Sequence, residues 1–257
     1  MLQRREFLKK VSLGYGAVTL SSIVPAFSNS MFKSSQSLIV HVSKPEFLSK
    51  ISNNILLQNP FADKIILCTF SADFLQEAID TKSNSKEIDA LLYSNELRNY
   101  SMDLDSNSIL KNLPFVNSDF QPTESEAFVQ EHLILKKSNL QIGVMGFILS
   151  DLKTSFFEVV EKMNKKAKEL RNVFGCDMVY CLTDDFGLET QKLSTIDFAE
   201  ATEGIDQFFS STTKASRLYV AANKNKEEVF ISLSNVNEKE QGVLTLERKD
   251  FRDFELG

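Results

Sequence analysis

Residues 175–187 of this chain read GCDMVYCLTDDFG. The apolar run from Met178 to Leu182 has the length and composition of a buried strand, and it stops at Asp184, Asp185 and a glycine. In parallel sheets, ligands bind at the carboxyl ends of the strands, where these two carboxylates are expected. The segment therefore predicts an α/β fold. It leaves three alternatives for the two aspartates, namely a solvated loop that caps the next element, an ion pair with a lysine, or a metal site.

The composition of the 257 residues is that of an ordinary globular protein. Hydrophobic residues make up 42% and charged residues 25%, and 21 Phe against no Trp predict a core built mostly of phenylalanine. We expect one domain over residues 31–257, preceded by an export signal at 1–30. Removing the signal takes +3 from the formal net charge of −6 and leaves −9, which argues against nucleic acid as a partner.

The first thirty residues have the layout of an export signal. Arg4 and Arg5 begin the pattern R-R-x-F-L-K, which resembles a twin-arginine signal, and a modestly apolar stretch containing Gly, Ser and Thr follows. Cleavage is expected between Ala26 and Ser30, which would leave a periplasmic or cell-envelope protein with no stable membrane span. The alternative is an N-terminal membrane anchor, for which seventeen residues interrupted by Gly, Ser and Pro are short.

Three cysteines, Cys68, Cys176 and Cys181, lie in or beside apolar runs. An odd number does not make a disulfide framework. Cys176 and Cys181 are five residues apart on one predicted strand, so they are expected to point to opposite faces of a sheet. The sequence predicts buried thiols that act as small hydrophobic side chains.

Apolar runs and helical stripes set the expected order of elements. Residues 81–111 are rich in Ser, Asn and Asp, and only 87–97 fits a helix there. A turn at 137–139 predicts a hairpin between the strands on either side. The expected strands are 37–42, 64–69, 115–116, 131–136, 140–148, 178–182, 206–210, 218–222, 228–234 and 242–247, and the expected helices are 45–57, 72–79, 156–173 and 194–203. This order predicts an α/β sandwich with helices outside paired sheets.

Four segments of the chain carry a family resemblance, and they read LPFVNSDF at 113–120, LQIGVMGF at 140–147, AKELRNVFGCDMVYCLTDDFG at 167–187 and EATEGIDQFFSSTTKAS at 200–216. Together they resemble the calcineurin-like metallophosphoesterases, and within them the catalytic domain of bacterial 5′-nucleotidases. The resemblance implies a four-layer α/β/β/α sandwich. It also implies two metal ions, held by five loops at the strand ends, that polarise a phosphate and deprotonate the attacking water.

The first three loops of the family have changed in this sequence. Lys44 and Glu46 stand where the family has a D-x-H pair, so a lysine replaces a metal ligand. In the second loop Asp73 keeps the carboxylate that bridges both metals in the family. The third loop, which reads N-H-E in the family, corresponds either to 94–96 or to the region around 103–105, and neither contains a histidine.

The last two loops have lost their histidines. Asp184 replaces the ligand histidine of the fourth loop, and Thr212 and Lys214 replace the two histidines of the fifth. The resemblance then implies that Lys44 and Lys214 neutralise Asp73 and Asp184, substituting ion pairs for bound metal ions. A run of hydroxyls at 210–213 is either a polar loop or a pocket for small anions.

The histidine content gives the same result without any alignment. The chain contains only His41 and His132, whereas the family site uses about four histidine ligands. His41 matches a non-ligand histidine of the family, and we expect it in the core or on the surface. The alternative is a site rebuilt from carboxylates, Asp73, Asp184 and Asp185 with Asp103 and Asp105, holding Mg²⁺, Mn²⁺ or Ca²⁺.

The resulting hypothesis is an exported relative of the 5′-nucleotidase catalytic domain that has lost its metals and its hydrolytic activity, with no catalytic residue and no cofactor. It would act as a binding or scaffolding partner. Because the sequence ends soon after the strand at 242–247, the expected partner is an active paralogue or a separately encoded nucleotidase C-terminal domain. The alternatives are a working metal-dependent phosphoesterase with a carboxylate-rich site, and a binder of small anions through Lys44 and Lys214.

Overall fold

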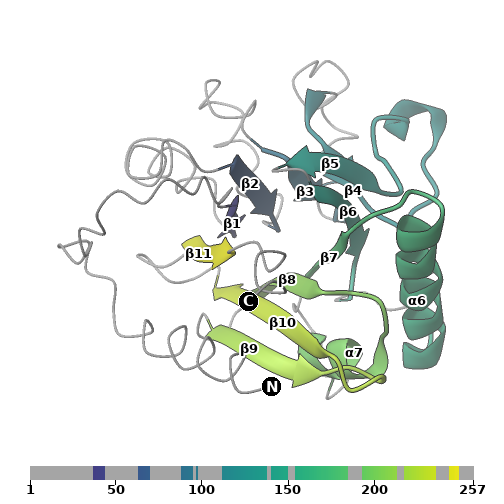
Figure 1. The fold of residues 1–257 in the computed structure, drawn as a ribbon. Helices are drawn as coiled ribbons and strands as arrows, with labels where there is room; N and C mark the ends of the chain where they lie inside the picture. Colours follow the sequence, from purple (N-terminus) through teal and green to yellow (C-terminus); the bar gives the residue numbers. More distant parts are fainter. Residues whose placement is uncertain are drawn as a thin grey trace, which may run out of the picture. The chain divides into compact units, whose positions relative to one another are not determined.

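Two stacked β-sheets form the framework of the protein in a computed structural model (Figure 1). The structure describes residues 37–43, 63–69, 88–94, 97, 112–137, 140–149, 154–184, 193–212, 217–235 and 243–248. All of them belong to one unit, Ser34–Gly257. The predicted signal with Arg4 and Arg5, its boundary at residue 30, and the helices expected at 45–57 and 72–79 lie outside the described residues.

The first sheet has five strands in the order β11-β1-β2-β3-β4. The strands from β1 to β4 are parallel, and β11 pairs antiparallel with β1. Their apolar runs of Val, Ile and Leu are typical of parallel strands that are covered on both faces. The strands are β1 (Ser37–Val42), β2 (Asp63–Cys68), β3 (Ala90–Leu92), β4 (Phe115–Val116) and β11 (Val243–Arg248).

The second sheet has six strands in the order β5-β6-β7-β8-β10-β9. The four inner strands are parallel, while β5 and β9 pair antiparallel at the two ends of this order. The pairing of Lys137 with Leu140 confirms the predicted hairpin. The strands are β5 (Leu133–Lys137), β6 (Leu140–Phe147), β7 (Met178–Asp184), β8 (Gln207–Thr212), β9 (Arg217–Ala222) and β10 (Glu228–Asn235).

The helix expected at 87–97 is wrong, because Ala90–Leu92 forms strand β3. This strand is buried between β2 and β4, and the Asp89 carboxylate accepts a hydrogen bond from the Ile66 backbone N–H at 2.9 Å. The sequence around it contains good helix formers, but burial between two parallel neighbours overrides that local preference.

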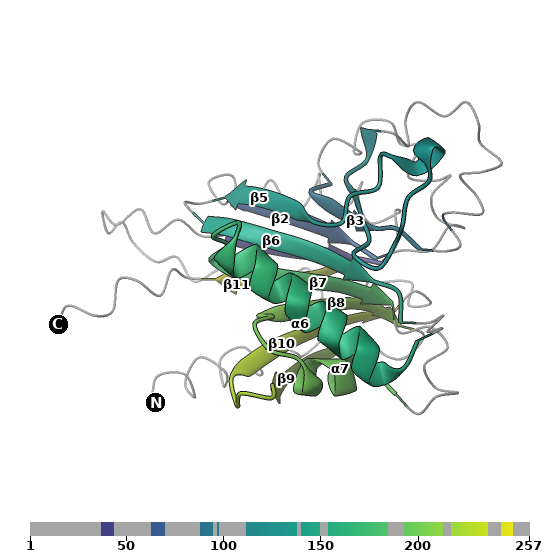
Figure 2. The same cartoon turned by 90° about the vertical axis from the view of Figure 1, so that its right-hand side faces the viewer.

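Two apolar cores hold the layers together. One fills the space between the sheets, and the other covers the opposite face of the second sheet, under α6 (Phe156–Asn172) and α7 (Thr195–Ala201). Figure 2 shows α6 lying along that face. The described layers therefore run helix, sheet, sheet, which confirms the predicted α/β sandwich, and the expected outer layer on the first sheet lies outside the described residues.

Helix α6 begins and ends where its sequence predicts. Ser155 caps it, accepting the Glu158 backbone N–H at 3.3 Å, while the Glu158 carboxylate accepts the Ser155 backbone N–H at 2.8 Å. Gly175, just beyond the helix, adopts the left-handed conformation with φ of 65°. None of the helices within the described ranges has an apolar stretch long enough to span a bilayer.

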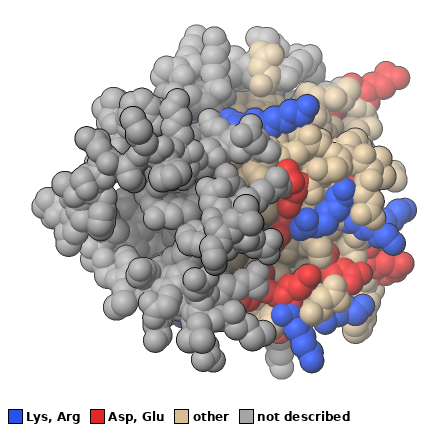
Figure 3. Space-filling view, in the orientation of Figure 1, with Lys and Arg blue, Asp and Glu red and all other residues tan. Residues whose placement is uncertain are grey.

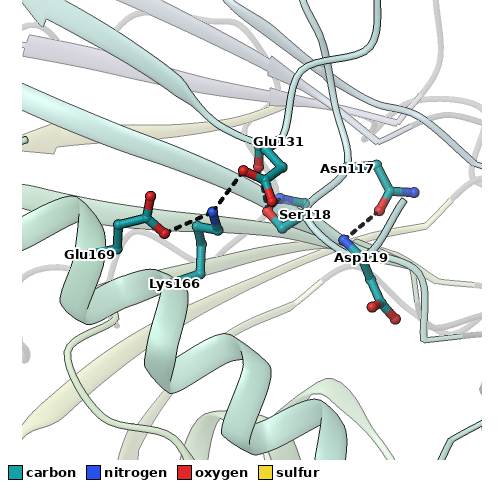
Figure 4. Close-up of polar contacts among 7 residues, drawn as sticks. Asn117, Ser118, Asp119, Glu131, Lys166 and Glu169 are labelled. Carbon is teal, nitrogen blue, oxygen red and sulfur yellow. Dashed lines mark hydrogen bonds and ion pairs between the residues drawn. The ribbon is translucent and has the colours of Figure 1, made fainter. Parts of the chain in front are cut away.

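Ion pairs join α6 to the segment that follows β4. Lys166 Nζ lies 3.1 Å from Glu131 Oε2 and 2.9 Å from Glu169 Oε2 (Figure 4). Lys162 Nζ lies 2.5 Å from Asp119 Oδ1 one turn earlier. The contacts of Lys166 fix the start of the segment that leads into β5. Positively and negatively charged side chains are interspersed over the described part of the face in Figure 3.

Gly146 marks a corner where strands of the two sheets approach each other closely. A Cβ atom at this position would lie 2.6 Å from the Val116 carbonyl oxygen. The Ser118 backbone N–H donates to the Gly146 carbonyl oxygen at 2.7 Å, and the Ser118 hydroxyl accepts the Gly146 N–H at 3.2 Å. A side chain on Gly146 would push β4 away from β6, so glycine is required here.

Candidate functional site

The carboxyl ends of the parallel strands of both sheets meet at one edge. Two contacts across the sheets establish this, since His41 of β1 faces Ser232 of β10 and Ser43 faces Ser234. Residue numbers rise together along the two strands, so β1 and β10 run in the same direction. Strand ends of this kind are where α/β proteins place their ligands.

The layer between the sheets changes from apolar to polar towards this edge. Along β8, Phe209 belongs to the inter-sheet core and Ser211 follows on the same face; along β7, Leu182 is followed by Asp184. We call the polar part of this layer the polar seam. It comprises His41, Ser43, Thr69, Asp184, Ser211, Ser232 and Ser234, whose exposed fractions are 0% to 5%.

His41 links three strands at the inner end of the polar seam. Its Nε2 lies 2.8 Å from Thr69 Oγ1, its Nδ1 lies 3.0 Å from Ser232 Oγ, and its ring packs edge-on against Phe209 at 5.4 Å. Complete burial lowers the pKa of His41 from 6.5 to about 3. The imidazole is therefore neutral at physiological pH, with one ring nitrogen donating and the other accepting.

Two serines bridge the sheets nearer to the edge. The Ser43 and Ser234 hydroxyl oxygens lie 2.8 Å apart, and Ser43 Oγ also lies 3.5 Å from the Asn235 carbonyl oxygen. Both serine side chains are buried, so each hydroxyl depends on a protein partner in place of water. The strand register puts Ser234 directly beside Ser211 on β10 and β8.

Asp184 is the last residue of β7 and its side chain is buried, with 5% exposed. Its Oδ1 accepts the Leu149 backbone N–H at 2.6 Å, which holds the end of β6 to the end of β7. The solvated loop suggested by the sequence is therefore wrong for Asp184. Asp185 lies outside the described residues, and the ion pair and metal alternatives for Asp184 stay predictions.

The structure does not bring Thr212 to the same face as Asp184. Alternation along β8 turns Ser211 into the polar seam and Thr212 towards the helix side, where the Thr195 hydroxyl donates to Ser210 Oγ at 3.1 Å. The run of hydroxyls at 210–212 thus divides between two faces and does not line one anion pocket. The remaining predicted site residues, Lys44, Glu46, Asp73, Lys214, Asp103 and Asp105, lie outside the described residues.

The second histidine belongs to a different part of the molecule. His132 precedes β5 and packs against Phe174, with ring centroids 4.5 Å apart and the ring planes tilted by 52°. Partial burial lowers the pKa of His132, and the nearby Lys166 lowers it further. These contacts place His132 among the neighbours of α6. The two histidines of the chain are thus held in separate places, His41 between the sheets and His132 near α6.

The described groups can bind by hydrogen bonding but offer no activated nucleophile. Burial raises the pKa values of Cys68 and Cys181, so these buried thiols stay protonated, as the sequence predicts. Within the described ranges, no three His, Cys, Asp or Glu side chains come together as a metal site. The polar seam combines one carboxylate, one neutral imidazole and several hydroxyls.

Sequence reasoning missed four members of the polar seam, Ser43, Thr69, Ser232 and Ser234. A signal was present in β10, where the run I-S-L-S-N alternates serine with apolar residues at the end of a strand. Because β10 is covered on both faces, those serines must be buried, and buried hydroxyls in register across two sheets mark a polar site.

No protein-family profile and no curated protein matches the chain. Among solved structures, it is similar to a hypothetical protein from Thermus thermophilus at 9% identity and a TM-score of 0.49, over 78% of this chain and 75% of the other. It is similar to a phosphatase from Mycoplasma pneumoniae at 13% identity and a TM-score of 0.48, over 80% and 73%. A 5′-nucleotidase from Candida albicans is similar at 10% identity and a TM-score of 0.47, over 77% of this chain and 45% of its own.

Proposed function

We propose that this chain is a phosphoesterase-like protein that does not hydrolyse phosphoesters and acts by binding a partner. The support comes from the strand ends, where the sequence resembles a binuclear metal site whose ligands have been replaced. A pair of divalent ions needs several carboxylates and neutral imidazoles with free lone pairs. The residues present at the described strand ends do not fit that requirement.

The histidines carry this proposal. The whole chain has two, one in the polar seam and the other beside α6. Both ring nitrogens of His41 bond within the polar seam, to Thr69 and Ser232, and complete burial lowers its pKa to about 3. His132 packs against Phe174 beside α6. A site with about four imidazole ligands cannot be assembled from these two residues.

Activity after metal exchange tests the proposal. The protein is dialysed against a chelator, refilled separately with Mn²⁺, Mg²⁺ and Ca²⁺, and assayed with p-nitrophenyl phosphate and a nucleoside monophosphate. We expect no hydrolysis above the metal-containing buffer, because no group at the described strand ends is placed to activate water. Elemental analysis of the purified protein should show no stoichiometric divalent metal.

The matched variants are Asp184→Asn and Asp119→Asn. Asp184 ends a strand at the candidate site, whereas Asp119 pairs with Lys162 beside α6. Metal-dependent turnover that Asp184→Asn or Asp73→Ala abolishes and Asp119→Asn leaves intact would establish the alternative, a working phosphoesterase with a rebuilt carboxylate site.

The remaining parts of the proposal come from the sequence. We propose export by the twin-arginine pathway, a periplasmic or cell-envelope location, and assembly with an active paralogue or with a separately encoded nucleotidase C-terminal domain.

A further inference from the structure

Strand β9 ends the second sheet in the order of its described strands (Figure 1). It pairs antiparallel with β10, and no strand among the residues that the structure describes pairs with its other side. Proteins usually protect such an edge with lysine or proline, because its free backbone groups attract other strands. Strand β5, at the opposite end of the order, carries Lys136 and Lys137, whereas residues 218–222 of β9 read LYVAA. The edge of β9 is therefore unprotected by charge.

The backbone groups on the free side of β9 belong to Leu218, Val220 and Ala222. The Asn223 backbone N–H donates to the Glu227 carbonyl oxygen at 2.9 Å, so these two residues form a hydrogen-bonded pair of the hairpin. Antiparallel strands alternate hydrogen-bonded and non-hydrogen-bonded pairs. Counting back along the register from Asn223, the N–H and C=O groups of residues 218, 220 and 222 point away from β10.

Phe230 on β10 supports this assignment independently. It is the register partner of Val220, and its backbone N–H donates to the Asp206 carbonyl oxygen at 3.1 Å, next to β8 and away from β9. Within the described ranges, the outward N–H and C=O groups of residues 218, 220 and 222 have no hydrogen-bond partner. They are available to a further strand.

The side chains of the same three residues are apolar. Tyr219 and Ala221 pack against the core beneath the helices, so alternation turns Leu218, Val220 and Ala222 to the opposite face of the sheet. Val220 is 42% exposed there. An edge that combines free backbone groups with exposed apolar side chains fits an added β-strand.

We propose that β9 pairs antiparallel with β9 of a second copy of this chain, about a two-fold axis at Val220. Such an axis pairs residues that lie on the same face of the sheet. The register centred on Val220 pairs it with itself and Leu218 with Ala222 of the second copy, which gives every outward N–H and C=O group of β9 a partner. Registers centred on Tyr219 or Ala221 would leave Ala222 or Leu218 without a partner in β9.

Charges at the ends of β9 fit the same register. It places Arg217 beside Asn223 of the second copy, and the Asn223 amide donates to the Glu227 carboxylate at 2.9 Å. Adjacent strands are about 4.8 Å apart, so each Arg217 guanidinium can reach Glu227 of the other copy. Neither Arg217 nor Glu227 forms a salt bridge in the part of the chain that the structure describes.

Sedimentation velocity of the full chain, from low to high micromolar concentration, tests the association. We expect a monomer–dimer equilibrium. Hydrogen exchange at the amides of residues 218, 220 and 222 should slow as the dimer forms, because each of these N–H groups then donates to the second copy. The exchange measurement uses the unmodified protein, so it does not depend on the folding of any variant.

Substitutions of Val220 test the position of the axis. Val220→Lys places two like charges directly opposite each other and should weaken the association at least about tenfold. Val220→Glu should do the same. An equimolar mixture of the two variants should dimerise again, because lysine from one copy then faces glutamate from the other. This recovery requires both variants to be folded.

Val173→Lys is the matched control. Val173 is 73% exposed at the end of α6, and it belongs to neither β9 nor β10. This variant adds the same charge in place of the same exposed side chain. It should dimerise as the unmodified protein does.

Three results would overturn the proposal. A protein that stays monomeric at every concentration would exclude a second copy as the occupant of this edge. A dimer that Val220→Lys retains would place the interface on another surface. A mixture of Val220→Lys and Val220→Glu that stays monomeric, with both variants folded by circular dichroism, would exclude an axis at Val220. None of these results bears on phosphoester hydrolysis, so this inference and the proposed function fail separately.

Discussion

The two halves of the layer between the sheets differ sharply although the same strands build both. One half is apolar and includes Ile39, Ile65, Tyr180, Leu182 and Phe209, all of them buried. The other half is the polar seam, which begins only two residues further along each strand. Residues two apart along a strand lie on the same face of the sheet, so the apolar residues that hold the sheets together and the polar residues of the candidate site follow one another on one face.

This difference separates the residues that stabilise the packing of the two sheets from the residues that could bind a ligand at their edge. Apolar side chains gain stability from leaving water and need no particular partner. Buried hydroxyls, by contrast, stabilise the protein only when each has a partner, because an unpaired polar group in a low dielectric is costly. The apolar half should therefore carry most of the stability, and the polar seam should carry specificity.

Truncation of Phe209 should have the largest effect. Phe209 is 0% exposed and packs edge-on against both His41 and Tyr180, at 5.4 Å and 5.5 Å between ring centroids. Phe209→Ala should lower the free energy of unfolding by about 3–5 kcal/mol, through lost burial and the cavity left behind. Urea denaturation followed by circular dichroism measures this change.

The matched variant is Phe209→Leu, which keeps most of the apolar volume and should cost less than about 1.5 kcal/mol. If Phe209→Ala cost no more than Phe209→Leu, the apolar half would not be what holds the sheets together. Loss of the helix signal together with the cooperative transition would show instead that Phe209→Ala does not fold.

The sequence predicted the elements that have one dominant signal. Strand β7 follows from an uninterrupted apolar run, and α6 follows from a helical stripe between Ser155 and Gly175. The prediction was wrong for strand β3, because its few residues carry helix-forming side chains and pair with strands formed by other parts of the chain. Short strands of this kind are determined by tertiary pairing, which no local pattern records.

The candidate site was less predictable than the fold. The sequence placed Asp184 correctly at the end of a strand, but it could not tell a buried carboxylate from a solvated one, because that depends on the Leu149 backbone N–H of a neighbouring strand. It grouped Thr212 with the same site, whereas alternation along β8 turns Thr212 away. The polar seam needs the register between the sheets, which only the structure supplies.

Acid should lower the free energy of unfolding through His41, which lies where the apolar half meets the polar seam. His41 has a pKa of about 3 in the folded protein and 6.5 as its ordinary value, so the unfolded chain binds a proton in this range that the folded chain does not. Stability should therefore fall as pH drops below about 6.5, by about 1.4 kcal/mol per pH unit and about 3 kcal/mol by pH 4. Urea denaturation at a series of pH values measures the slope.

The His41→Gln variant isolates this contribution, because glutamine can bond to Thr69 and Ser232 without titrating. The difference in unfolding free energy between the original protein and this variant should shrink as pH falls from 7 to 4. Other groups, among them His132 with its lowered pKa, contribute equally to both proteins and cancel in the difference. A difference that is constant with pH would contradict a buried, neutral His41.

The smallest effect is expected for the hydroxyl pair that bridges the sheets in the polar seam. Ser43→Ala and Ser234→Ala should each cost about 1 kcal/mol, and a double-mutant cycle should give a coupling of about 0.5–1.5 kcal/mol, since the two oxygens lie 2.8 Å apart. The losses of unfolding free energy caused by Ser43→Ala and by Ser155→Ala at the cap of α6 should add, because the hydrogen bonds of these two serines share no partner. Zero coupling between Ser43 and Ser234 would mean that the sheets do not meet through hydroxyls at this edge. The contrast with the apolar half would then be one of composition alone.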